Sequence, residues 1–490
     1  MSRVPPDPRI LRQKRLEDQV WYHGIRSREE IEPELRHLGD FAVRSTTQRG
    51  MVEIVLNVRS DTGVSNFTLS IAPETPDVPW PRYFLHYLQN NPQRPEFDTV
   101  VDLVNHYRFN RLPGEQILKK GVHRPRWLLK HRSIQFNRQK DRLGAGNFCE
   151  VFKGHITDER GSAVSVAIKV CHSSQTADLA AGEEARRSLM REAKIMNAYQ
   201  HPHVINFVGV ACDHFPVMIV MGFCPGGSLE DHVRKRSARI SSHELLLYAF
   251  EASAAYGMRY LHRQGCIHRD LAARNCLISA DGAVRIADFG LSKLVGDFNP
   301  ENEVLQAIPL RWMAPETLSR TPLNSDVWAW AIMCFEFFNG GRAPWDGVDD
   351  NKAISRAIRA IDIPPLPEQT PEVIKQIAAE IWVRDPERRP TFKQIVVRLL
   401  DHLLAHVSEF PSVEQLAVNQ LPDEPRDQIV KEDRSAAVSQ SSRRLRPPSR
   451  RRQAPGVASR SSSLSSETTR RPSIRNNERR TQSTDEEREN

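Results

Sequence analysis

A series of short motifs between residues 143 and 328 constrains the fold of this 490-residue chain more than any other feature. In chain order they are LGAGNFCEV (143–151), VAIK (166–169), HRDLAARN (268–275), RIADFG (285–290) and SDVW (325–328). Glycine-rich and β-branched segments dominate up to about residue 222, and longer helical periods follow. The pattern predicts a strand-rich lobe followed by a helix-rich lobe.

The motifs place charged residues where a phosphate could bind. Glycines allow the backbone to approach a phosphate closely, and Lys169 supplies a fixed cation after a strand. Glu192 lies on a helical period and can pair with Lys169, which keeps the lysine protonated. Asp270 and Asn275 share one loop, and Asp288 follows a strand. Two carboxylates and an amide near a phosphate can coordinate magnesium and orient a hydroxyl group.

The ordered set, with MAPE at 313–316, resembles the protein kinases. This resemblance implies transfer of the γ-phosphate of ATP, with Mg²⁺ held by Asn275 and Asp288 and with Asp270 as the catalytic base. The nucleotide-binding residues that it implies are Leu143, Gly144, Ala145, Gly146, Asn147, Phe148, Cys149, Val151, Ala167, Lys169, Glu192, Met221, Phe223 and Cys224.

The loop sequence indicates which hydroxyl group is phosphorylated. Serine/threonine kinases usually have a lysine two residues after the catalytic aspartate, whereas this chain has Ala272 there and Arg274 four residues on. HRDLAARN with IPLRWMAPE is the tyrosine-kinase pattern, so we expect Arg274 to act with Asp270 and Lys169 in catalysis on tyrosine. The resemblance also implies scaffold roles for Asp326 and for a pair between Arg389 and Glu316.

Two positions in this region keep alternative interpretations. Cys149 replaces the third glycine of the glycine-rich loop and either crowds the phosphate or is a tolerated small residue. Met221 stands at the gatekeeper position and serves as adenine wall, core residue or both.

The N-terminal region has a second motif set. The pattern of residues 21–112 predicts a small antiparallel sheet between two helices, at 28–37 and 99–107. WYHG (21–24) and GDFAVRST (39–46) resemble the SH2 domain, whose strand arginine grips phosphotyrosine. The resemblance implies that Arg44 binds the phosphate through its forked guanidinium, with Arg28 and Thr46 as further contacts and Ser45 in the same loop. From the strand alone, the favoured interpretation is an ordinary strand arginine paired with a carboxylate.

An SH2 domain followed directly by a kinase domain, with WYHG, RWLLKH and LGAGNF, most resembles the Fes/Fer group of non-receptor tyrosine kinases. The expected fold class is therefore α+β and multidomain. Its parts are an N-terminal extension (1–20), an SH2 domain (21–112), a linker (113–135), a bilobal kinase domain (136–407) and a disordered tail (408–490).

Net charge separates the tail from the rest. Residues 431–490 hold 15 Lys/Arg and 8 Asp/Glu, a net charge of +7 out of +8 for the whole chain. This segment has 13 serines and no aromatic residue, which predicts disorder. The remainder is nearly neutral, so we expect no nucleic-acid binding by the folded parts. The tail could contact an anionic membrane or remain solvated.

Composition and termini bear on location and partners. The chain shows no apolar run long enough to span a membrane, no signal peptide and scattered cysteines, so we expect a cytoplasmic protein with reduced thiols, peripheral to a membrane if the tail binds one. The expected partners are protein substrates and, through the SH2 domain, tyrosine-phosphorylated proteins.

The segment that would gate a kinase active site, 297–316, contains no tyrosine. In the family, Arg269 pairs with a phosphate on this segment. Here Glu301 or Glu303 could supply part of that charge, or both could be solvated acids. The competing interpretation is a pseudokinase adaptor that docks through Arg44.

Overall fold

The computed structural model describes residues 15–48, 51–145, 149–157, 161–171, 179–236, 239–253, 257–294, 309–318 and 324–406. The expectations for Gly146, Asn147, Phe148, Glu301, Glu303 and the tail concern residues outside these ranges. Within them, no helix is long and apolar enough to cross a membrane.

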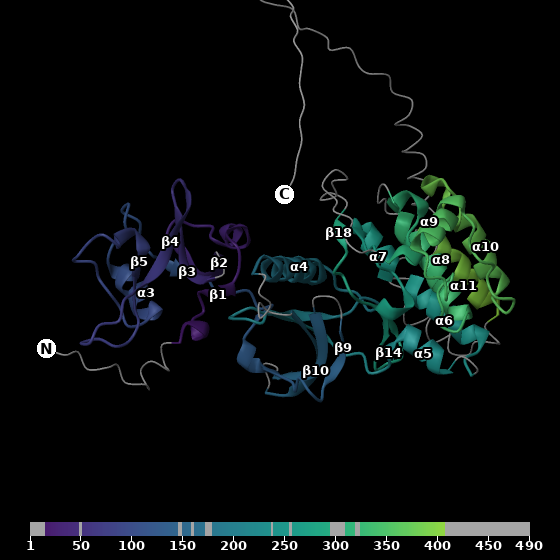
Figure 1. Cartoon of the computed structure of the whole chain (residues 1–490), viewed down its shortest axis with the longest axis horizontal. Coiled ribbons are helices and arrows are strands. Elements are labelled where there is room, and N and C mark those ends of the chain that lie inside the picture. Colours follow the sequence, from purple (N-terminus) through teal and green to yellow (C-terminus); the bar gives the residue numbers. More distant parts are fainter. Residues whose placement is uncertain are drawn as a thin grey trace, which may run out of the picture. The chain divides into compact units, whose positions relative to one another are not determined.

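The first sheet occupies residues 22–121 (Figure 1). Its strands are β1 (Tyr22–Ile25), β2 (Asp40–Gln48), β3 (Met51–Ser60), β4 (Gly63–Ala72), β5 (Arg82–Leu85) and β6 (Lys120–Gly121). They lie in the order β1 to β5, and β6 pairs with β2. The prediction of a wholly antiparallel sheet is wrong at two pairings, because β1 and β6 both run parallel to β2. Each connects to β2 through a long segment, as parallel strands require.

Two helices cover opposite faces of this sheet. Side chains alternate along β2, so Phe41 and Val43 pack with α3 (Val100–Phe109) while Ala42 packs with Ile31 of α2 (Arg28–Ile31). The arrangement of a sheet between two helices is therefore as predicted.

The first helix is shorter than predicted. Helix α2 ends at Ile31 and is followed by one 3₁₀ turn, Glu32–Glu34. Pro33 lacks the N–H that a longer α-helix would need, which explains why the helix does not continue to His37.

A second sheet begins the region predicted to be a kinase domain. Its strands are β7 (Leu128–Leu129), β8 (Ile134–Gln135), β9 (Arg142–Ala145), β10 (Cys149–Thr157), β11 (Ala163–Cys171), β12 (Phe207–Ala211) and β13 (Met218–Gly222). The order is β7-β12-β13-β11-β10-β8, with β9 against β10. Helix α4 (Leu179–Ala198) lies against β11 and β12 (Figure 1). Strands β6, β7 and β8 fall inside the predicted linker 113–135, so six residues of that segment belong to the two sheets.

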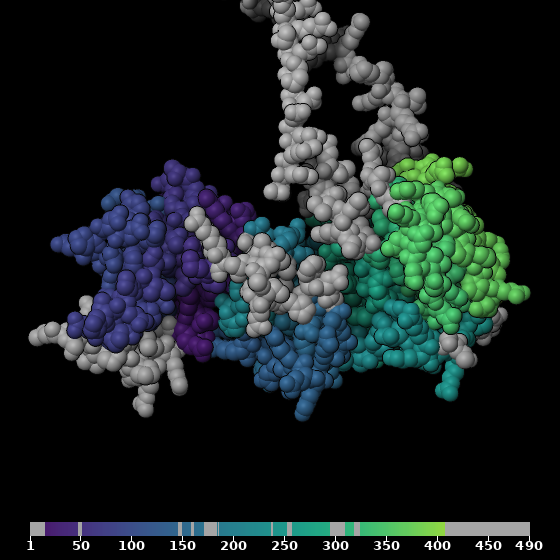
Figure 2. Space-filling model, viewed as in Figure 1, coloured from purple at the N-terminus to yellow at the C-terminus, as the bar shows by residue number. Residues whose placement is uncertain are grey.

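Helices dominate from residue 229 onward, as predicted. They are α5 (Leu229–Arg236), α6 (Ser242–Ser253), α7 (Gly257–Arg263), α8 (Asn324–Phe338), α9 (Asn351–Ala360), α10 (Glu372–Ile381) and α11 (Phe392–Ala405). Their side chains pack into one continuous mass (Figure 2). Helix α8 is buried from Ser325 to Phe338 and contacts α5, α6 and α10.

Short strand pairs hold the loops of this region. They are β14 (Gly227–Ser228), β15 (Cys266–Ile267), β16 (Cys276–Ile278), β17 (Val284–Ile286) and β18 (Lys293–Leu294). β16 pairs with β14 and β17, and β15 pairs with β18. These pairings fix both ends of residues 268–275, which we call the HRD loop.

Strand β1 hydrogen-bonds to the turn after β12. Ile25 donates its N–H to the carbonyl oxygen of Cys212 at 2.6 Å, and the Tyr22 hydroxyl donates to the carbonyl oxygen of Asp213 at 2.8 Å. A Cβ atom at Gly24, whose φ is 72°, would lie 2.3 Å from the Cys212 oxygen. This close approach explains why the WYHG motif needs its glycine.

Candidate active site

Lys169 lies in β11 and pairs with two carboxylates. Its Nζ atom is 2.8 Å from both carboxylate oxygens of Glu192 on α4 and 3.1 Å from Oδ1 of Asp288. Burial alone would lower the pKa of Lys169, but Glu192 and Asp288 raise it above its ordinary value. The predicted pairing with Glu192 is therefore present, and the lysine remains a cation.

The HRD loop brings Asp270, Arg274 and Asn275 together. Arg274 donates from Nη2 to Oδ1 of Asp270, and Asn275 donates from Nδ2 to Oδ2 of Asp270 at 2.8 Å. Asn275 also reaches the Asp270 carbonyl oxygen at 2.7 Å. Burial raises the pKa of Asp270, and Arg274 opposes this shift. These contacts orient one carboxylate whose proton affinity is increased, as a general base requires.

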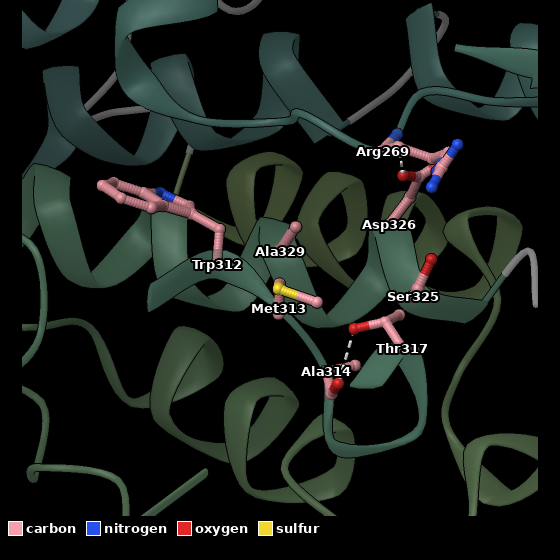
Figure 3. A pocket seen from close by; sticks show the side chains of 8 residues that line it. All are labelled: Arg269, Trp312, Met313, Ala314, Thr317, Ser325, Asp326 and Ala329. Carbon is pink, nitrogen blue, oxygen red and sulfur yellow. Dashed lines mark hydrogen bonds between the residues drawn. The ribbon is translucent and has the colours of Figure 1, made fainter. Parts of the chain in front are cut away.

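Asp326 at the start of α8 anchors the first half of this loop. Its Oδ2 accepts from the backbone N–H of His268 and its Oδ1 from that of Arg269, each at 2.8 Å. His262 contacts the same carboxylate at 3.0 Å. Figure 3 shows Asp326 beside Arg269, at a cavity of about 20 Å³ that Met313 and Ala329 also line. The scaffold role expected for Asp326 agrees with this geometry.

The donor set at Asn275 and Asp288 fits a magnesium ion. Because Asn275 directs its Nδ2 atom at Asp270, its Oδ1 atom can serve as a ligand. The Asp288 side chain is 47% exposed, and Lys169 lowers its pKa although burial would raise it. Carboxylate and amide oxygens are hard ligands that suit Mg²⁺. The described residues contain no cluster of three His, Cys, Asp or Glu that could hold a metal ion.

The predicted nucleotide wall is mostly apolar. Met221 and Ala167 are each 8% exposed and belong to one large hydrophobic cluster, against which Val151 and Cys149 also pack. The half-buried Cys149 side chain thus packs onto this core, and Cys149 lies opposite Cys171 in the antiparallel register. Met221 is therefore a core residue, and its role as an adenine wall stays a prediction.

The remaining wall residues lie at its edges. Leu143 is 51% exposed on β9, where Gly144 and Ala145 are also exposed. Phe223 and Cys224 follow β13: the Phe223 ring lies 4.9 Å from Nζ of Lys153 on β10, and Cys224 is buried.

The segment after the undescribed residues 295–308 is fixed by arginines. Arg311 donates to the carbonyl oxygens of Pro344 at 3.1 Å and Val348 at 2.7 Å. Arg389 donates from Nη2 to Glu316 at 2.8 Å, which is the predicted pair. These contacts hold residues 309–316 against the helices.

The Arg44 side chain is buried at the first sheet, with 6% exposure. Its Nε donates to Oδ1 of Asn57 and its Nη1 to the carbonyl oxygen of Arg26, each at 3.1 Å. Both acceptors are neutral. Burial lowers the pKa of Arg44, while Glu29 opposes this shift and Arg28 adds to it.

The neighbours predicted for Arg44 differ in position. Thr46 is half-buried on β2, and Arg28 pairs with Glu32 at 2.6 Å and is 51% exposed. Ser45 and Thr46 do not lie in a loop, because β2 continues to Gln48 in register with β3. The Ser45 hydroxyl is buried and hydrogen-bonded to Tyr22 at 2.9 Å.

Sequence reasoning missed residues that orient the predicted ones. Asn57 and the Arg26 carbonyl accept hydrogen bonds from Arg44. The Trp312 ring contacts the Arg274 guanidinium and donates a hydrogen bond to Glu336. For Asn57, a polar residue within a buried part of a strand was the available signal. A glutamate inside the apolar run of α8 was the signal for Glu336.

Comparison with known proteins identifies the family to which the chain belongs. The family model for protein tyrosine and serine/threonine kinases matches residues 137–399. Fer-related kinase 1 of Caenorhabditis elegans is 33% identical over 389 residues, which cover 77% of this chain and 92% of that protein. The transforming protein Fps of avian sarcoma virus (strain PRCII) is 32% identical over 402 residues, covering 80% and 69%. Human tyrosine-protein kinase Fer is 32% identical over 395 residues, covering 79% of this chain and 44% of Fer. The chain belongs to the protein kinase family, as a protein tyrosine kinase of the Fes/Fer group.

Proposed function

We propose that this kinase uses Asp270 as the base that accepts the substrate hydroxyl proton, with Arg274 placing the carboxylate and Lys169 holding the nucleotide phosphates. Asn275 and Asp288 would hold Mg²⁺, which when bound neutralises charge on the phosphate oxygens of ATP. The observation that carries the proposal is the convergence of Arg274 and Asn275 on the two oxygens of Asp270.

A kinase assay tests these roles. The purified chain would be incubated with ATP, Mg²⁺ and a poly(Glu,Tyr) copolymer, beside Asp270→Asn. We expect the variant to lose at least about 100-fold in rate, because asparagine cannot accept the proton. Equal signals from both proteins would support the competing interpretation, an adaptor that works by docking alone.

We further propose that residues 21–112 form an SH2 domain that binds phosphotyrosine through Arg44. The supporting observation is a buried guanidinium whose two hydrogen bonds both go to neutral oxygens. A phosphate dianion would compensate this charge with charge-assisted bonds. A fluorescence-polarisation titration with one peptide in phosphotyrosine, phosphoserine and unmodified forms tests this, and binding that does not depend on phosphotyrosine would refute it.

The remaining expectations concern location and partners. We propose a cytoplasmic enzyme whose partners are protein substrates and tyrosine-phosphorylated proteins, with the basic tail contacting anionic membrane. Salt-sensitive binding to phosphatidylserine vesicles that is lost on deleting 431–490 is the expected result. Binding that survives the deletion would argue against this role.

A further inference from the structure

Glu336 is a buried glutamate that no step proposed above uses. It lies near the end of α8 and is 1% exposed. Its Oε2 atom accepts two hydrogen bonds, from the backbone N–H of Ala273 at 3.1 Å and from Nε1 of Trp312 at 2.9 Å. One oxygen therefore joins the HRD loop to the segment that follows residue 308.

The Trp312 ring extends this connection to Arg274. The guanidinium carbon of Arg274 lies 4.4 Å from the ring centroid, which is the distance of a cation–π contact. Arg274 in turn pairs with Asp270. Glu336 thus reaches Asp270 by two routes, through the backbone at Ala273 and through the ring of Trp312.

Helix α8 consequently holds the HRD loop at two places. Asp326 accepts from the backbone at its beginning, and Glu336 accepts from the backbone near its end. The two acids are ten residues apart on one helix, or about 15 Å. In Figure 3, Trp312, which donates to Glu336, lies on the opposite side of the drawn cavity from Asp326 and Arg269. Asp270 lies in the stretch of loop between the two attachments.

Keeping an acid at this place is costly. Burial raises the pKa of Glu336 to about 7, against the two hydrogen bonds and the attraction of Arg274, while Glu230 adds repulsion. An apolar side chain of similar size would avoid this desolvation. What the carboxylate provides in return is the fixed geometry of its two hydrogen-bond donors, Ala273 and Trp312.

We propose that Glu336 is a positioning residue for tyrosine phosphorylation: it fixes Arg274 and Asp270 relative to the segment Leu310–Trp312, and this segment contacts the substrate. The proposal rests on the roles proposed above for Asp270 and Arg274. A small displacement of a catalytic group can lower a rate by about 100-fold. The residues proposed to bind ATP are positioned separately, by the pair of Lys169 and Glu192. The KM for ATP should therefore not change.

Steady-state kinetics on the full chain test this proposal, with poly(Glu,Tyr) and ATP varied independently. Glu336→Leu removes both hydrogen bonds, and we expect kcat to fall at least about tenfold and the copolymer KM to rise at least about threefold, with the ATP KM within about twofold of wild type. Glu336→Gln keeps an acceptor oxygen and should restore both values to within about threefold.

Glu251→Leu is the matched control. Glu251 is a buried acid of α6 that accepts from the backbone N–H of Val284, and burial raises its pKa to about 7 as well. We expect the control to lower the thermal midpoint as Glu336→Leu does, without the rise in copolymer KM. Equal kinetic effects of the two leucine variants would assign Glu336 a general structural role and overturn the proposal.

Trp312→Phe gives a second test that does not depend on Glu336→Leu folding. Phenylalanine keeps a ring beside Arg274 but donates no hydrogen bond. The copolymer KM should therefore rise, by less than in Glu336→Leu, while the ATP KM stays unchanged. Combining it with Glu336→Leu should add less than the sum of the two effects, and full additivity would refute the link. An active Asp270→Asn would instead refute the proposed function, whatever the Glu336 variants show.

Discussion

Two cations, the half-buried Lys169 and the buried Arg44, are compensated in opposite ways. Lys169 contacts the carboxylates of Glu192 and Asp288, at 2.8 and 3.1 Å. Arg44 donates to an amide oxygen and a backbone carbonyl, both neutral. The pKa of Lys169 is raised by its carboxylates, whereas burial lowers that of Arg44.

The difference bears on what each site does before a ligand arrives. The charge of Lys169 is balanced by the protein, so a nucleotide phosphate would share a cation already held in place. The charge of Arg44 has no carboxylate in hydrogen-bond contact among the described residues, so an arriving phosphate would supply the missing anion. Removing the two cations should therefore affect stability differently.

The largest expected effect is at Lys169. Lys169→Met should reduce kinase activity at least about 100-fold. It should also lower the free energy of unfolding by about 3 kcal/mol, because it leaves Glu192 buried without its cation. Adding Glu192→Gln should recover most of the stability and none of the activity. Chemical denaturation and the copolymer assay measure the two quantities, and an unchanged stability of the single variant would break the comparison.

Replacing Arg44 should change binding more than stability. Arg44→Lys should weaken phosphotyrosine-peptide binding by about 100-fold, since an ammonium cannot form the bidentate contact. Arg44→Met should change the free energy of unfolding by less than about 1 kcal/mol, because relief of desolvation offsets the two lost hydrogen bonds. If Arg44→Met lowered the free energy of unfolding as much as Lys169→Met, both cations would be needed for stability.

Asn57 offers a smaller effect on the same binding. Asn57→Ala removes the acceptor that orients Nε of Arg44 and should weaken peptide binding by about tenfold. Isothermal titration calorimetry on the folded variant measures this. An unchanged affinity would mean that the Arg26 carbonyl alone orients the guanidinium.

The smallest effect is expected at Asn66. It accepts a hydrogen bond from Nδ2 of Asn57 and therefore affects Arg44 only through Asn57. Asn66→Ala should weaken phosphotyrosine binding by about threefold in the same titration. A loss larger than that of Asn57→Ala would instead indicate a direct contact of Asn66 with the phosphate.

The sequence predicted those parts of the site whose chemistry depends on fixed spacing. Asp270, Arg274 and Asn275 share one loop, and Lys169 meets Glu192 because a strand and the next helix pack together. Asn57 and Glu336 could not be predicted in these roles, since strand register and helix packing bring them to their partners from a distance. Pro33 ended the first helix early, and the short strands β1, β5 and β6 have too few residues to show a period.

The burial of α8 has a consequence for the order in which the chain becomes competent during synthesis. The first sheet is complete once β6, at residue 121, has been made. The HRD loop must wait for Asp326 and Glu336, and the hydrophobic cluster that includes α8 is complete only with α11, which ends at Ala405. At about 5–20 residues per second, roughly 15–55 s separate the two events. A nascent chain would therefore complete the sheet that carries Arg44 well before it could phosphorylate a substrate.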